Sequence, residues 1–128
     1  MKQYQIHEPT NLKPKPDEWE RITARLMAEY LKSDIEFVVR KSSTTPDIMA
    51  IRLNQFWEIK NIVGNSSNTI HNNLKSIDRQ SENVVITLFR TKMRARKAYS
   101  EIIIHLKKAT RIKRLVLITN SKKIIVIK

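Results

Sequence analysis

The hairpin that decides the fold is predicted within residues 44–62, TTPDIMAIRLNQFWEIKNI. Its two strands are expected at Asp47–Ile51 and Phe56–Ile62, because both runs are rich in residues that favour extended structure. Pro46 fixes its own φ and favours an extended conformation before it, which places Asp47 at the mouth of the first strand. The rest of the chain is predicted to be arranged around this hairpin.

Three side chains of the hairpin are candidate catalytic residues: Asp47, Glu58 and Lys60. Side chains alternate along a strand, so Glu58 and Lys60 share one face, and the hairpin can bring Asp47 beside Glu58. Two neighbouring carboxylates repel each other unless a cation joins them, and oxygen ligands suit Mg²⁺ or Mn²⁺. Lys60 could orient a water, act as a base or stabilise transition-state charge, and the sequence does not choose among these roles.

Each of these residues also has a structural interpretation. Aspartate after proline is common in turns, and Glu58 and Lys60 could form a solvent-facing pair on a strand. However, Phe56 and Trp57 precede them and Ile59 separates them, so the strand is predicted to be central. Charges on a central strand are costly unless they are paired or functional. We therefore favour the catalytic interpretation.

Helices and strands surround the hairpin in the predicted order αβββαβαββ. The first helix follows Asp17, an expected N-cap that forms a capping box with Glu20. The remaining elements are a strand at 35–40, a helix at 66–80, a strand at 84–89 buried on both faces, a helix at 92–109 and strands at 115–119 and 123–127. This order predicts an α/β (α+β) fold with a central mixed sheet flanked by helices. Residues 1–16 hold three prolines and are expected to be a linker or N-terminal arm, with one domain at 17–128.

Composition excludes several classes of function. The chain of 128 residues has no cysteine, so disulfides and thiolate metal sites are excluded, and its single glycine argues against Walker and Rossmann phosphate loops. It has no apolar run long enough to span a bilayer and no signal-peptide core. His7 and His105 have no evident partners in the sequence and are predicted to be structural or surface residues.

The net charge of +13 is concentrated in the last third of the chain. Residues 1–89 hold 12 Lys and Arg against 11 Asp and Glu, whereas residues 90–128 hold 13 against one. Such a domain attracts polyanions, and nucleic acid is the favoured partner over a solvated surface or an acidic protein. The candidate nucleic-acid contacts are His71, Lys75, Arg79, Gln80, Arg90, Lys92, Arg111 and Arg114.

Two family resemblances lie in these segments. Pro46-Asp47 followed by Glu58-Ile59-Lys60 resembles the signature of PD-(D/E)xK nucleases, whose restriction-endonuclease-like core has the order αβββαβ. Residues from about 18 to 128, and the stretch from 46 to 88 in particular, also resemble the C-terminal tRNA-nuclease toxin domain of contact-dependent growth inhibition (CdiA) proteins. The best-matching parts are Trp57-Glu58-Ile59-Lys60, Asn68-Thr69-Ile70, Asn72-Asn73-Leu74, Gln80-Ser81 and Asn83-Val84-Val85.

The resemblance implies that residues 17–128 are a nuclease domain, a metal-dependent ribonuclease that cleaves tRNA. It further implies a cognate immunity protein, expected to be acidic, and action in the cytoplasm of a target bacterium after delivery as the end of a larger secreted or surface protein. A DNA endonuclease or junction resolvase on the same fold, and a basic nucleic-acid-binding module without catalysis, remain alternatives.

Members of the PD-(D/E)xK superfamily often add an acid from the first helix, and Glu20 is the candidate for this role. It precedes Ala24, Met27 and Leu31 on one helical stripe, so it could face inward and share the metal with Asp47. Its structural interpretation is the capping box at the start of the helix. The sequence leaves both interpretations open.

Overall fold

The computed structural model describes residues 3–42, 45–64, 67–77 and 81–128, and divides the chain into two compact units, Met1–Ile59 and Lys60–Lys128. The boundary falls inside strand β4 (Gln55–Asn61), which contributes its first five residues to unit 1 and its last two to unit 2. Each unit is described by itself. No helix among the described residues is long and apolar enough to cross a membrane.

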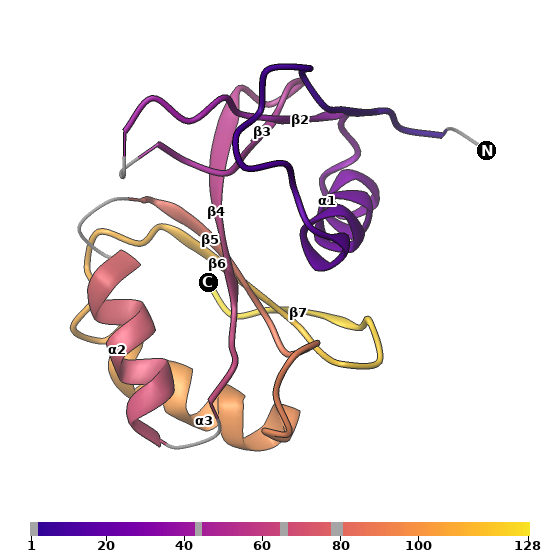
Figure 1. Ribbon diagram of the computed structural model, residues 1–128. Helices are drawn as coiled ribbons and strands as arrows, with labels where there is room; N and C mark the ends of the chain where they lie inside the picture. The colour runs from indigo at the N-terminus through magenta and orange to yellow at the C-terminus, as the bar shows by residue number, and fades with distance from the viewer. Residues whose placement is uncertain (1–2, 43–44, 65–66, 78–80) are drawn as a thin grey trace. The chain divides into compact units, whose positions relative to one another are not determined.

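Unit 1 is a mixed sheet with one helix (Figure 1). Its elements are β1 (Ile6–His7), α1 (Glu18–Leu31), β2 (Ile35–Phe37), β3 (Ile48–Ala50) and the first part of β4. Strand β1 is parallel to β2, whereas β2–β3 and β3–β4 are antiparallel. The predicted hairpin is therefore confirmed, with Ile48 opposite Trp57 in its register.

Helix α1 begins and ends with identifiable caps. The Asp17 side chain accepts a hydrogen bond from Glu20 N at 2.8 Å and the Glu20 side chain accepts one from Asp17 N at 3.0 Å, which confirms the predicted capping box. At the other end, Lys32 adopts φ 52° and Arg52 donates to the carbonyls of Leu31 and Lys32. These bonds satisfy backbone groups that a helix terminus otherwise leaves unpaired.

The segment expected to be a linker or arm is attached to unit 1. Besides the pairing of β1 with β2, Arg21 donates two hydrogen bonds to Glu8 at 2.9 and 3.0 Å, and Gln5 N donates to Asp34 at 2.9 Å. Leu12 is buried. Strand β1 was not predicted, because two residues are too short to form a periodic pattern.

Unit 2 contains two helices and the last three of the seven strands in the sheet order. Its elements are α2 (Ser67–Ile77), β5 (Asn83–Thr87), α3 (Ala95–Leu106), β6 (Arg114–Ile118) and β7 (Ile124–Val126). Strands β5 and β6 are parallel and β7 is antiparallel to β6. All five residues of β5 are buried, as predicted for a strand covered on both faces.

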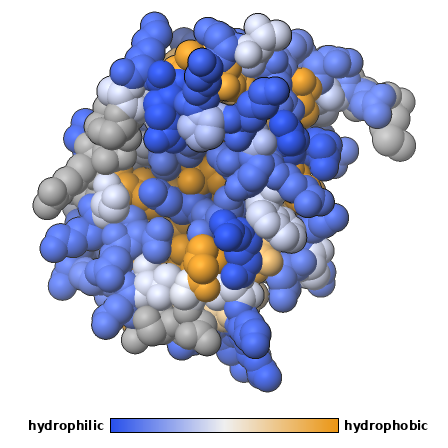
Figure 2. Space-filling view, viewed as in Figure 1, coloured by the Kyte–Doolittle hydropathy of each residue, from blue (hydrophilic) through white to orange (hydrophobic). Residues whose placement is uncertain are grey.

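The core of unit 2 lies between the helix pair and the sheet. Its buried residues come from α2, β5, α3 and β6, and they include Ile70, Leu74, Ile86, Ile102 and Leu117. This arrangement places α2 and α3 side by side over one face of the β5–β6 pair (Figure 1). On the face of the molecule drawn in Figure 2, hydrophilic residues cover most of the surface.

The predicted mixed α/β class and element order are confirmed, apart from the additional β1 and shifts of a few residues at element ends. One of the larger shifts is at the start of α3, which begins at Ala95 rather than near 92. Thr91 explains it, because its hydroxyl donates to Gly64 O at 2.7 Å and accepts from Met93 N at 3.1 Å. These bonds hold residues 91–93 in a loop, and the N-cap Arg94 is still extended.

Candidate functional site

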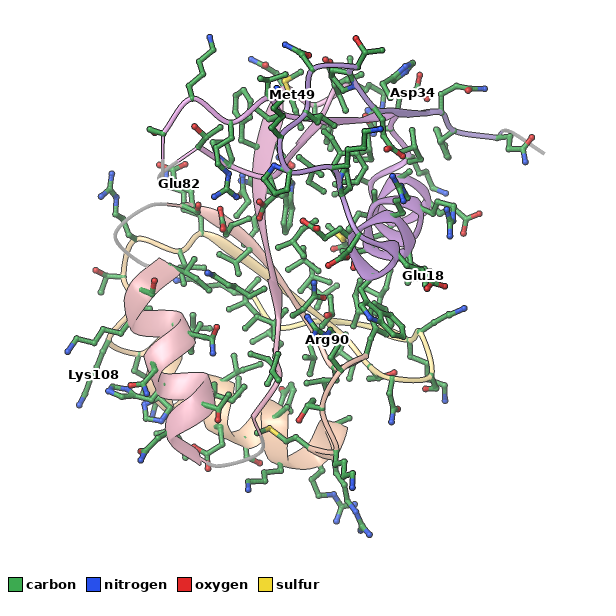
Figure 3. The ribbon with its side chains drawn as sticks, viewed as in Figure 1. Glu18, Asp34, Met49, Glu82, Arg90 and Lys108 are labelled. Carbon is green, nitrogen blue, oxygen red and sulfur yellow. The ribbon has the colours of Figure 1, made fainter. Side chains whose placement is uncertain are left out.

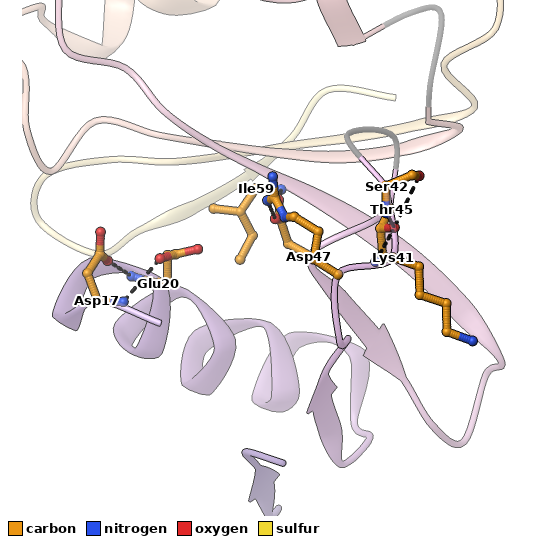
Figure 4. Close-up of polar contacts among 8 residues, drawn as sticks. Asp17, Glu20, Lys41, Ser42, Thr45, Asp47 and Ile59 are labelled. Atoms are coloured by element: carbon orange, nitrogen blue, oxygen red, sulfur yellow. Dashed lines mark hydrogen bonds and ion pairs between the residues drawn. The ribbon is translucent and has the colours of Figure 1, made fainter. Parts of the chain in front are cut away.

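Asp47 is held in the hairpin by several hydrogen bonds. Its carboxylate is 12% exposed, and its Oδ2 accepts a hydrogen bond from Ile59 N at 2.7 Å (Figure 4). Its own backbone N donates to Trp57 O at 3.2 Å, and its carbonyl accepts from Val38 N at 3.0 Å. Main-chain and side-chain bonds together therefore hold this aspartate between β2 and β4.

The two bonds from Asp47 to β4 reach the residues on either side of Glu58, which places Asp47 next to this glutamate along the hairpin. The neighbours of Glu58, Trp57 and Ile59, are 1% and 7% exposed, whereas Glu58 itself is half-buried. The burial pattern thus follows the predicted alternation. Lys60, also half-buried, lies two residues further along the same strand and is the first residue of unit 2.

Glu20 and Asp47 line one pocket of unit 1, with a cavity volume of about 60 Å³. Its remaining walls come from the segment before α1 and the end of the β2 segment, and they include Lys13, Phe37 and Arg40. A single water needs on the order of 10–15 Å³ measured in this way, so the pocket has room for a few waters. Glu20 therefore fulfils both sequence interpretations of its position: it caps α1 and it faces the space beside Asp47 (Figure 4).

The charges around this pocket favour protonation of Glu20. Burial is the largest effect and raises the pKa of the Glu20 carboxyl above 4.5, while the hydrogen bond from Asp17 N lowers it. The negative charges of Asp17 and Asp47 raise it further, and Arg40 lowers it. Arg40 Nη2 also lies 3.5 Å from Asp47 Oδ1. The pocket thus holds two carboxyl groups that raise each other's proton affinity, and the charge of Arg40 partly offsets this effect.

The donor set at Asp47 and Glu58 fits a hard divalent cation. Carboxylate oxygens are the ligands that Mg²⁺ and Mn²⁺ prefer, and Mg²⁺ usually takes one or two carboxylates plus waters and phosphate oxygens. Across the residues that the structure describes, no three or more His, Cys, Asp or Glu side chains are grouped to hold an ion. A cation here would therefore rest on Asp47 and Glu58 and complete its coordination with water and phosphate.

The predicted nucleic-acid contacts that the structure describes all lie in unit 2. His71 and Lys75 are one turn apart on α2, and Arg90 is exposed on the loop after β5 (Figure 3). The others are exposed on the loop before α3, the loop after it and the start of β6; they are Lys92, Arg111 and Arg114. Arg79 and Gln80 lie outside the described residues.

Two residues beside candidate positions were not identified from the sequence. Arg40 pairs with Asp47, and the signal was its place at the end of the β-rich run IEFVVR, just before the loop that leads to the aspartate. His105 was predicted to have no partner, which is wrong, because its Nδ1 lies 3.1 Å from His71 Nδ1. His7 lies 3.7 Å from Asp34 and also has a partner. The His71–His105 pair is separated by 34 positions in the sequence and the His7–Asp34 pair by 27, so neither contact leaves a local pattern.

Comparison with known proteins agrees with this architecture. The family model of the contact-dependent growth inhibition CdiA C-terminal domain matches residues 44–124. The structure is similar to a solved CdiA-CT/CdiI toxin and immunity complex from Burkholderia pseudomallei, with a TM-score of 0.64 and 17% sequence identity, over 97% of this chain and 98% of that chain. At this identity the likeness concerns the fold alone. No curated protein matches the chain in sequence.

Proposed function

Because the chain belongs to the family of contact-dependent growth inhibition CdiA C-terminal domains, we propose that this toxin domain is a ribonuclease that uses a divalent cation, with tRNA as its substrate. The observation that carries the proposal is the pair of hydrogen bonds between Asp47 and strand β4. Asp47 N donates to Trp57 O and Asp47 Oδ2 accepts from Ile59 N, so Asp47 and Glu58 are opposite each other in the hairpin register, which supports a shared site.

The chemistry follows from what these residues can do. A bound Mg²⁺ or Mn²⁺ would lower the pKa of a coordinated water and neutralise charge on the phosphate. Asp47 and Glu58 would supply its protein ligands, and Asp47 is already oriented by Ile59 N. Glu20 would contribute a carboxyl group whose pKa is raised chiefly by burial. Lys60, on the strand that carries Glu58, would stabilise negative charge at the phosphate.

Unit 2 supports RNA as the substrate. The loops around α3 have exposed basic residues and almost no acidic residues among them. A surface that serves only solubility normally mixes positive and negative charges. Accessible aromatic side chains are few, so we expect contacts to the sugar-phosphate backbone rather than extensive base reading. Affinity should then fall steeply as salt is raised.

The proposal includes a protein partner and a place of action. The solved relative is a complex of a toxin with its immunity protein, and we propose that this chain has an immunity protein of its own, which is acidic because it must face a net charge of +13. Toxicity would be exerted in the cytoplasm of a target bacterium, after delivery as the end of a larger surface protein.

End-labelled total tRNA incubated with the full chain tests the proposal. We expect discrete cleavage products in Mg²⁺ or Mn²⁺, none in excess EDTA, and no cleavage of plasmid DNA under the same conditions. Asp47→Asn and Lys60→Ala should each lower the rate at least a hundredfold, since removing one group that stabilises the transition state commonly costs a factor of about 10²–10³.

Asp34→Asn is the matched control. Asp34 also accepts a backbone N–H, from Gln5, yet it lies beside β1 and not on the hairpin. The Asp34→Asn protein should cleave tRNA at the wild-type rate. Undiminished RNA cleavage by Asp47→Asn, or in EDTA, would contradict the proposed site, and cleavage of DNA in place of RNA would contradict the substrate.

A further inference from the structure

Helices α2 and α3 bring two histidines into direct contact within unit 2. His71 Nδ1 lies 3.1 Å from His105 Nδ1, and the ring centroids are 4.5 Å apart with an angle of 47° between the ring planes. His105 Nε2 lies 3.5 Å from Oε2 of Glu101, one turn earlier on α3. Both α3 side chains are about one-fifth exposed, so the cluster is neither sealed in the core nor fully solvated.

The Glu101 carboxylate favours one tautomer of His105. An ionised carboxylate only accepts hydrogen bonds, so at 3.5 Å it favours the ring with its hydrogen on Nε2. That tautomer leaves the Nδ1 lone pair of a neutral ring for the contact with His71. A histidine whose second nitrogen donates to a carboxylate is the usual arrangement for a metal-ligating imidazole, because the carboxylate orients the ring and raises its basicity.

The spacing of the two Nδ1 atoms also suits an ion between them. A Zn²⁺ ion about 2.0–2.1 Å from each nitrogen would make an N–metal–N angle of roughly 100° at the observed 3.1 Å separation, between the square-planar and tetrahedral values. We propose that His71 and His105 form a two-histidine binding site for a borderline transition-metal ion such as Zn²⁺, Ni²⁺ or Cu²⁺, with Glu101 orienting His105.

The ligand chemistry distinguishes this site from the carboxylate hairpin. Imidazole nitrogen prefers Zn²⁺, Ni²⁺ and Cu²⁺, whereas Mg²⁺ prefers oxygen. Glu101 faces the other nitrogen of His105, and the described residues contain no group of three or more His, Cys, Asp or Glu side chains that could hold an ion, so water would fill the remaining positions. Glu101, the one acidic residue between 90 and 128, lies behind His105 and offsets part of the positive charge of this region.

A bound ion would join α2 to α3 by one coordinate bond from each helix. It would replace the single hydrogen that the two Nδ1 atoms can share, and the ring that loses this hydrogen would take a proton from water on its Nε2 and stay neutral. Because the fold then gains a ligand that the unfolded chain holds poorly, metal should stabilise unit 2. The inference does not rest on RNA cleavage, since no residue of the hairpin takes part.

Titration of the metal-free full chain with ZnCl₂ and with CuCl₂ tests the site. Calorimetry should give one Zn²⁺ per chain with micromolar affinity, and Zn²⁺ should raise the urea midpoint of unfolding. The electron paramagnetic resonance spectrum with Cu²⁺ should show hyperfine splitting from two imidazole nitrogens. MgCl₂ at equal concentration should produce neither effect.

Histidine variants test whether His71 and His105 bind the metal ion. His71→Gln and His105→Gln should each weaken Zn²⁺ binding at least tenfold and lose one imidazole nitrogen from the Cu²⁺ spectrum. His7→Gln, which changes a histidine that also faces a carboxylate, should bind like the wild type. Zn²⁺ binding that persists in His71→Gln but is lost in Asp47→Asn, or a wild-type chain that binds no Zn²⁺ at 100 micromolar, would overturn the proposal.

Discussion

Replacing Asp47 by alanine should destabilise unit 1 and separate the structural role of this residue from its catalytic one. The substitution removes the acceptor of the 2.7 Å bond from Ile59 N and the 3.5 Å ion pair with Arg40. Ile59 is 7% exposed, so its N–H has little access to water when the carboxylate is gone.

The size of the effect follows from these two contacts. Loss of a hydrogen bond to a charged acceptor, with a buried donor left unsatisfied, costs about 2–4 kcal/mol. The Arg40 side chain is 53% exposed, so solvent screens the ion pair and it adds at most about 1 kcal/mol. Asp47→Asn keeps an oxygen that can accept from Ile59 N, and we expect it to lose only about 1 kcal/mol.

Urea unfolding followed by tryptophan fluorescence measures the difference, since Trp57 is 1% exposed and lies on the strand that Asp47 holds. With a denaturant slope on the order of 1–3 kcal/mol per molar, the midpoint of Asp47→Ala should fall by roughly 1–2 M. Asp47→Asn should unfold near the wild-type midpoint and still be inactive on tRNA. An Asp47→Ala protein as stable as the wild type would refute the hydrogen-bond assignment.

Three further predictions concern pH, a loop contact and salt. Burial raises the pKa of Glu20 above 4.5, so the contribution of its protonated form to stability is present below pH 4.5 and is lost as the pH rises through the folded-state pKa. Glu20→Gln should therefore be more stable than the wild type at pH 7 and lose that advantage below pH 4.5. Urea titrations at the two pH values measure the difference. Ser33→Ala should cost about 1–2 kcal/mol in the same assay, because the buried Ser33 hydroxyl accepts from Arg52 N at 2.9 Å, and an unchanged midpoint would contradict this. Arg90→Ala should weaken tRNA binding and make the slope of log affinity against log salt shallower by about 0.7–1, and an unchanged slope would remove Arg90 from the interface.

The sequence predicted those features that depend on short-range rules. The capping box at Asp17 and Glu20 needs only residues three apart, and the buried strand β5 needs only a continuous apolar run. The hairpin followed from two β-rich runs and a turn, in which Asn54 adopts the left-handed conformation that asparagine tolerates well. Each of these is a local preference that the fold preserves.

The features that could not be predicted join distant segments. Nothing in Ile6-His7 indicates a strand until its partner β2 is in place, and the pairing of His71 with His105 needs α2 and α3 to lie together. The sequence predicts two alternative roles for Glu20, a helix cap and an inward-facing acid. The three-dimensional arrangement lets one side chain cap the helix and line the pocket. Long-range packing, rather than propensity, determines such contacts.

Strand β4 has a consequence for how this domain can diversify among relatives. Asp47 accepts a hydrogen bond from the β4 backbone at Ile59, the last residue of unit 1. Two residues later Asn61, which belongs to unit 2, accepts one from Thr87 of the same unit. A genetic crossover at the boundary of the two units would therefore join half-strands from different parents. Modules separated by a flexible linker can be shuffled freely, whereas here the halves must be inherited together or exchanged at a loop on either side of the strand.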